Sequence, residues 1–78
     1  MLLAVDVGNT RIKVAVFEGN TLLEQFHFSS TELRNELHFI LNKYKNTSDL
    51  IVASVGNLTK DAFFEFEDQV NIHFISTD

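Results

Sequence analysis

The sequence predicts a single α/β domain in which a mixed five-stranded sheet packs against two helices. Three strand-like stretches within residues 2–28 follow one another with only short turns between them, which indicates an antiparallel meander. After residue 28, helical and strand patterns alternate, as is typical of strands joined by helical crossovers. The 78 residues are enough for one small domain with a modest core.

The first two strands are predicted on either side of a tight turn. Four apolar residues, Leu2 to Val5, lead to a single carboxylate at Asp6, and turn-forming residues follow at 8–10. From Arg11 to Phe17 apolar residues alternate with others, which is the period of two expected for a strand. A second short turn leads to a third strand over Leu22–Phe28.

A helix is predicted from a cap at Ser29 to about Lys43 or Tyr44. Ser29 and Glu32 have the spacing of a capping box. The predicted buried stripe consists of Leu33, Leu37, Ile40, Leu41 and Tyr44. His38 falls off this stripe and is expected to face solvent.

The remaining chain is predicted as strand, helix and strand. Leu50–Val55 is a continuous apolar run, which indicates a central, parallel strand covered on both faces. Ser54, near its end, could face a ligand or simply pack as a small residue. A second helix is expected to begin at a Thr59 cap, and the last strand to cover Asn71–Ser76. The residues that this helix would bury are Ala62, Phe63, Phe66 and Val70.

Composition and charge narrow the classes of function. The net charge is −5 and the six basic residues are scattered, which argues against a surface for nucleic acid or anionic membrane. The absence of cysteine suits the cytoplasm. The N-terminal apolar run meets Asp6 too soon for a signal peptide or a membrane span. We therefore expect a cytoplasmic protein that binds neither nucleic acid nor membrane.

The turn after the first strand is the candidate functional site. An acid at the end of a buried strand, here Asp6, is unfavourable unless a charged or hydrogen-bonding group requires it. Gly8 can take a positive φ, and the N–H groups of such a turn can converge on an anion. Asn9 and Thr10 add donors, and Lys13 adds positive charge. These groups fit a phosphate, and a hydrated Mg²⁺ between that phosphate and Asp6 fits the acid.

An ordinary hairpin turn would contain the same residues, so the residues alone leave both interpretations open. The run Asp6–Thr10, DVGNT, followed by the strand from Arg11, resembles the first phosphate motif of type III pantothenate kinases. These kinases belong to the acetate kinase, sugar kinase, Hsp70 and actin superfamily. Residues 51–55, IVASV, resemble a strand ending in Ser-Val in the same family. That family usually continues with Val-Pro, whereas this chain has Gly56-Asn57.

The resemblance implies a ribonuclease H-like fold, the actin-like ATPase half, with the strand order 3-2-1-4-5. The turn after the first strand and the loop after the fourth would then open on one edge, where ligands collect in such sheets. Residues 1–78 would be the N-terminal nucleotide-phosphate-binding domain of a longer, two-domain protein.

The resemblance also implies an activity, which is transfer of the ATP γ-phosphoryl group to pantothenate in coenzyme A biosynthesis. It implies a homodimer that uses ATP, Mg²⁺ and a monovalent cation, K⁺ or NH₄⁺. Asp6 would orient Mg²⁺ through water. The phosphate-binding residues would be Gly8, Asn9 and Thr10, with Arg11 or, as we favour, Lys13 lending positive charge. The catalytic base is expected beyond Asp78, so the 78 residues alone should be inactive.

Two alternatives to a kinase remain at this point. One is a kinase-like transcriptional accessory factor that keeps the fold and acts as a regulatory protein. The other is a self-contained, non-catalytic binding module that uses the same sheet without phosphate chemistry.

Overall fold

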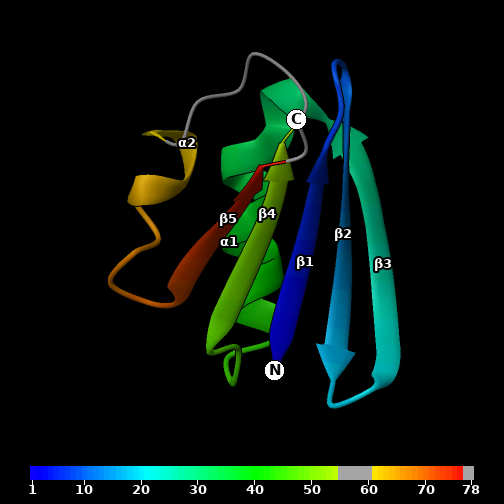
Figure 1. The fold of residues 1–78 in the computed structure, drawn as a ribbon, viewed down its shortest axis with the longest axis vertical. Helices are drawn as coiled ribbons and strands as arrows, with labels where there is room; N and C mark the ends of the chain where they lie inside the picture. Colours follow the sequence, from blue (N-terminus) through cyan, green and yellow to red (C-terminus); the bar gives the residue numbers. More distant parts are fainter. Residues whose placement is uncertain (55–60, 77–78) are drawn as a thin grey trace.

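The sheet has five strands in the order β3-β2-β1-β4-β5 (Figure 1), in a computed structural model that describes residues 1–54 and 61–76. The strands are β1 (Leu2–Val7), β2 (Arg11–Glu18), β3 (Thr21–Ser29), β4 (Asp49–Ser54) and β5 (Asn71–Ser76). β2 is antiparallel to β1 and to β3, whereas β1, β4 and β5 are parallel. The predicted α/β class, the meander and the ribonuclease H-like strand order are therefore confirmed.

The helical layer consists, in the described ranges, of a 3₁₀ turn and two α-helices. These are η1 (Ser30–Glu32), α1 (Leu33–Lys43) and α2 (Asp61–Phe64). The Ser29 hydroxyl accepts the Thr31 N–H at 3.4 Å, so the predicted cap forms on η1, which leads directly into α1. α1 ends where it was predicted to end. Within the described residues, neither helix is long and apolar enough to cross a membrane.

The second helix is shorter than the sequence pattern predicted. α2 ends at Phe64, and the Phe66 N–H then bonds to the Phe63 carbonyl, three residues back, at 3.0 Å. Such 3₁₀-like turns keep residues three apart on one side. Phe63, Phe66 and Val70 are therefore buried as predicted, although most of them lie outside the helix. The expected cap at Thr59 lies outside the described residues.

A β-bulge interrupts the pairing of β2 with β3. The pairs change from Val16–Glu24 to Phe17–Leu22. The period of two predicted Leu22 on the same face as Phe28, but a residue opposite Phe17 shares the face of Phe17. Leu22 is accordingly 46% exposed, whereas Phe28 is buried.

α1 and the segment around α2 cover one face of the sheet (Figure 1). The rings of His38 on α1 and Phe66 lie 4.7 Å apart, and Phe63 meets Phe74 of β5 edge-on at 6.0 Å. The core between the layers includes Leu3, Val5 and Val7 of β1, Ile12, Val14 and Val16 of β2, and Leu33, Leu37, Ile40 and Leu41 of α1. The predicted helical stripe is therefore buried, with Tyr44 packed against the core at its end.

The opposite face of the sheet, here called the open face, is not covered by any helix of the described residues. Its side chains alternate with those of the core. They include Ala4 and Asp6 of β1, Lys13, Ala15 and Phe17 of β2, Ile51 and Ala53 of β4, and Ile75 of β5. β4 is thus central and parallel, as predicted. The prediction that both of its faces are covered is wrong for the described residues, since Leu50 and Val52 are buried but Ile51 and Ala53 are only partly so.

Candidate phosphate-binding site

The candidate site is the turn between β1 and β2, at the upper end of the sheet in Figure 1, where the parallel strands terminate. The Gly8 N–H donates to the Arg11 carbonyl at 3.0 Å, and the Ser30 N–H donates to the Thr10 carbonyl at 3.1 Å. The first bond closes the hairpin. The second ties the turn to the start of η1, so the helical layer also fixes its position.

Gly8 is required by space and not by a left-handed backbone. Neither Gly8 nor Asn9 has a positive φ, so the left-handed turn expected to form an anion-binding nest is wrong. A Cβ added to Gly8 would lie 3.0 Å from the Arg11 carbonyl oxygen, which its N–H already contacts. The exposed side chains of Asn9 and Thr10 are therefore the donors best placed to meet a phosphate.

Asp6 and Lys13 face each other across the β1–β2 ladder directly below this turn. Both are exposed, and both line a groove of about 470 Å³ on the open face. No ion pair joins the two side chains, and neither bonds to another side chain among the described residues. The carboxylate is thus available for a hydrated cation, and the ammonium group for an anion.

The structure separates the two cations that the sequence left as candidates. Lys13 lines the groove beside Asp6. Arg11 is exposed and pairs with Ser29 at the end of the β2–β3 ladder, outside the set of groove-lining residues. This placement favours Lys13 as the nearer source of positive charge.

Sequence reasoning missed the other residues that share the groove with Asp6. His27 lies opposite Lys13 on β3, and Ala53 lies beside Asp6 on β4. The alternation within each strand shows which residues share a face of that strand. Only the pairing between strands, which needs the register, brings these distant residues to one place.

The second predicted loop can be followed only to the end of β4. Ser54, the last residue of β4, pairs with Val7 of β1, so the two strands end side by side as predicted. The Ser54 side chain and the loop at Gly56-Asn57 lie outside the described residues.

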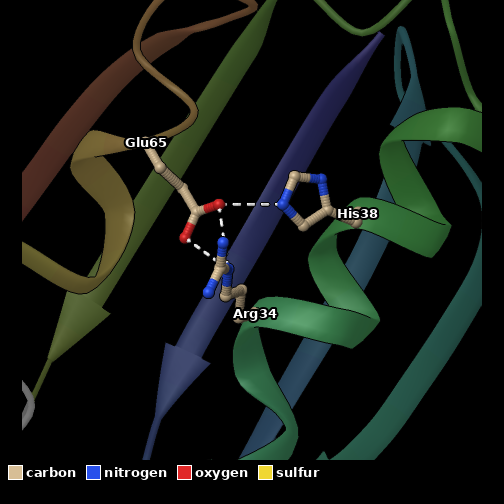
Figure 2. Close-up of polar contacts among 3 residues, drawn as sticks. All are labelled: Arg34, His38 and Glu65. Atoms are coloured by element: carbon tan, nitrogen blue, oxygen red, sulfur yellow. Dashed lines mark hydrogen bonds and ion pairs between the residues drawn. The ribbon is translucent and has the colours of Figure 1, made fainter.

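A carboxylate joins the two helical segments behind this end of the sheet (Figure 2). Glu65, just after α2, pairs with His38 Nε2 at 2.8 Å and with Arg34 Nε at 3.2 Å. The hydrogen bond from His38, and then the Arg34 charge, lower the pKa of the Glu65 carboxyl below its ordinary value. His38 was expected to face solvent, and its side chain is 49% exposed, but it also makes this contact.

A second carboxylate cluster lies where α1 ends, away from the candidate site. Glu24 of β3 accepts hydrogen bonds from Lys43, at 2.8 Å, and from the Tyr44 hydroxyl. The bond from Lys43, followed by that from Tyr44, lowers the pKa of the Glu24 carboxyl. The same contact with Glu24 raises the pKa of Lys43 and that of Tyr44.

The comparisons with known proteins agree with this geometry. The sequence profile of the type III pantothenate kinase family matches residues 2–77. A type III pantothenate kinase of Flavobacterium johnsoniae is 55% identical over 76 residues, which are 97% of this chain and 31% of that protein. A type III pantothenate kinase of Flavobacterium psychrophilum is 47% identical over 76 residues, 97% of this chain and 32% of that protein. The chain thus spans about a third of the length of these relatives.

Proposed function

The chain belongs to the type III pantothenate kinase family, and we propose that it is the ATP-phosphate-binding part of such a kinase. The whole enzyme would transfer the γ-phosphoryl group of ATP to pantothenate, the first committed step toward coenzyme A. The observation that supports this most is the Asp6–Lys13 pair, set below the Asn9–Thr10 turn and on the groove. The family match favours this function over the transcriptional accessory factor and the binding module.

Phosphoryl transfer depends on holding the phosphates in line and on neutralising their charge. The Asn9 amide and the Thr10 hydroxyl would donate hydrogen bonds to phosphate oxygens. The Lys13 ammonium group, below the turn, would add a charge-assisted contact. Gly8 keeps the turn narrow, so no side chain at that position separates the donors from the ligand. Arg11, which is exposed beside the turn, would contribute positive charge at longer range.

The Asp6 carboxylate fits Mg²⁺, which prefers oxygen ligands and usually keeps several waters beside one or two carboxylates and the substrate phosphates. Mg²⁺ bound there would neutralise phosphate charge. Asp6 would hold it through water, because its carboxylate is exposed and engaged by no described partner. A monovalent cation, K⁺ or NH₄⁺, a homodimer and a cytoplasmic location complete the proposal, and we assign no described residue to them.

We place the catalytic base and the pantothenate site in the part of the kinase outside these 78 residues. A second domain closing over the groove would exclude water and so strengthen the contacts of Asn9, Thr10 and Lys13 with the phosphates. The proposed role of this chain is therefore to bind and orient the phosphates of ATP.

The proposal is tested by assaying phosphopantothenate formation from pantothenate and MgATP with K⁺ present. We expect product from the full-length protein and none from residues 1–78 alone. In the full-length protein, Asp6→Asn should raise the Mg²⁺ concentration needed for half-maximal rate, because it removes the charged oxygen ligand. A full-length protein that folds but forms no product would overturn the proposal. Product from residues 1–78 would show that the base lies within them.

A further inference from the structure

The open face of the sheet has the composition of a buried surface. β1 and β4 each contain four consecutive apolar residues, Leu2–Val5 and Leu50–Ala53, so both faces of these central strands are apolar. Strands with this pattern are normally covered on both faces. In the described part of the chain, α1 and the α2 segment cover one face, and no helix covers the other.

A groove crosses the open face where three adjacent strands present alanine. Ala15 of β2 lies opposite Ala4 of β1, and Ala53 of β4 lies one row further along the strands. These small side chains line the groove of about 470 Å³ together with the larger Phe17 and Ile75. The distance between packed elements depends on the side chains at the contact, so a row of alanines allows a helix to approach closely.

The polar residues of the open face lie at the two ends of the groove's apolar middle. Asp6 and Lys13 are at the end next to the candidate phosphate site. Asp49 and His73 pair at 3.2 Å at the other end of β4 and β5. An apolar centre with polar margins is complementary to an amphipathic helix that turns its apolar stripe toward the sheet.

We infer that the open face docks an amphipathic helix of the same polypeptide, supplied by the part of the full-length kinase outside the 76 matched residues. The inference rests on the proposed function, because it takes this chain to be part of a longer kinase. The relatives have the necessary length, since the matched residues make up 31% of one and 32% of the other. A helix on the same chain also binds at a high effective concentration, without association of a second molecule.

A second copy of this chain suits the groove less well than a helix. A two-fold dimer would set the same surface against itself, groove against groove. The floor at Ala4 and Ala15 would then face empty space and lose dispersion contacts on one side. A convex helix would fill the groove.

The chain contains no cysteine, so single cysteines can report coverage of the open face. The test uses the full-length protein without nucleotide, with any other cysteine replaced by serine. Ala15→Cys and Ala53→Cys place a small thiol in the groove, and Asn20→Cys places one in the exposed turn between β2 and β3 as the control. The rate of thiol labelling is measured in the native protein and in urea.

We expect native labelling of the two groove cysteines to be at least about 100-fold slower than in urea, and that of Asn20→Cys to differ only a few-fold, because protection requires a stable cover. Equal native rates at all three positions would overturn the inference. Protection that disappears on dilution would indicate a second copy, and protection that requires MgATP would indicate nucleotide. Either result would also overturn it.

The covering segment is identified by Phe17→p-benzoylphenylalanine, a photocrosslinker of similar shape at the margin of the groove. The expected product is a crosslink within one chain, to a helical segment outside residues 1–78. A crosslink between two chains would overturn the inference. Protected cysteines in a protein that does not phosphorylate pantothenate would support docking and refute the proposed function. Product formation with unprotected cysteines would do the reverse.

Discussion

The tripeptide Gly-Asn-Thr occurs at both ends of β2, at residues 8–10 and 19–21, and the two copies form different turns. Gly19 has φ +60° and nothing within 4 Å of an added Cβ, as in a type II′ hairpin whose first central residue is glycine. Gly8 has no positive φ, and its added Cβ would meet a backbone oxygen at 3.0 Å. Identical residues therefore fulfil different requirements, because the surrounding strands and not the tripeptide decide the backbone.

The two ends of β2 also differ in what lies around the turn. At the 8–10 end, Asp6 and Lys13 face each other below the turn, and η1 holds the turn through Ser30. The 19–21 turn joins Glu18 directly to Thr21, the last pair of the β2–β3 ladder. The capacity to bind phosphate thus depends on the charged neighbours and not on the Gly-Asn-Thr sequence itself. The comparison also provides an internal control for every experiment on the candidate site.

The largest expected difference between the two turns is in ATP kinetics. In the full-length protein, Asn9→Ala should raise KM for ATP and lower kcat, because it removes a phosphate donor. One lost charge-assisted hydrogen bond is worth about 1.5–3 kcal/mol, or about one to two decades in kcat/KM. The matched control Asn20→Ala changes the same residue type in the other turn, and its steady-state kinetics with ATP should be those of the unmodified protein. Equal effects of the two substitutions, or unchanged kinetics for Asn9→Ala, would rule out the 8–10 turn as the phosphate site.

A smaller difference is expected in the free energy of unfolding when each glycine is replaced. Gly19→Ala should destabilise by about 1–2 kcal/mol, because alanine is disfavoured at positive φ, and Gly19→Asn should cost less because asparagine tolerates that backbone better. Gly8→Ala should also destabilise, by about 1–3 kcal/mol, because its Cβ meets a backbone atom.

At position 8, asparagine should be no better tolerated than alanine, since both carry the offending Cβ. Urea unfolding of the 78-residue chain, which we expect to unfold cooperatively, measures all four variants. If Gly8→Asn were more stable than Gly8→Ala, a backbone conformation and not a steric contact would be the reason for glycine at that position.

Local and periodic features of the fold could be predicted from the sequence. The strand order followed from the meander and the resemblance, and the bounds of α1 followed from its cap at Ser29 and its apolar stripe. At the candidate site, the residues Asp6 to Lys13 were found from the turn chemistry and the family motif. Whether they bind ATP remains a prediction.

The features that the sequence could not predict depend on contacts between elements. The φ of Gly8 is set by how β1 and β2 pair, and α2 ends early because 3₁₀-like turns place Phe66 beside Phe63 on the sheet. The contact of His38 with Glu65 requires knowing that α1 and the α2 segment lie side by side. No pattern within one element contains that information.

The smallest expected difference between the two ends concerns pH, through the Glu65 cluster and the Glu24 cluster. Both carboxyl groups have a folded pKa below their ordinary value, so each contributes stability that is present above the unfolded pKa and lost as pH falls through the folded one. Stability should therefore decline from about pH 5 to about pH 3, and Glu65→Gln or Glu24→Gln should each make that decline shallower. The effects should be modest, because all of these groups are solvent-exposed.

The alkaline range distinguishes the clusters. Contact with Glu24 raises the pKa of Lys43 and that of Tyr44, so their contribution is complete below the unfolded pKa and is lost as pH rises through the folded values. Urea unfolding between about pH 9 and about pH 11 should show a decline that Glu24→Gln reduces and Glu65→Gln leaves unchanged. A decline that responds equally to both substitutions would mean that the alkaline loss does not originate at the Glu24 end. The comparison of the two ends would then fail for stability, whatever the kinetics of Asn9→Ala show.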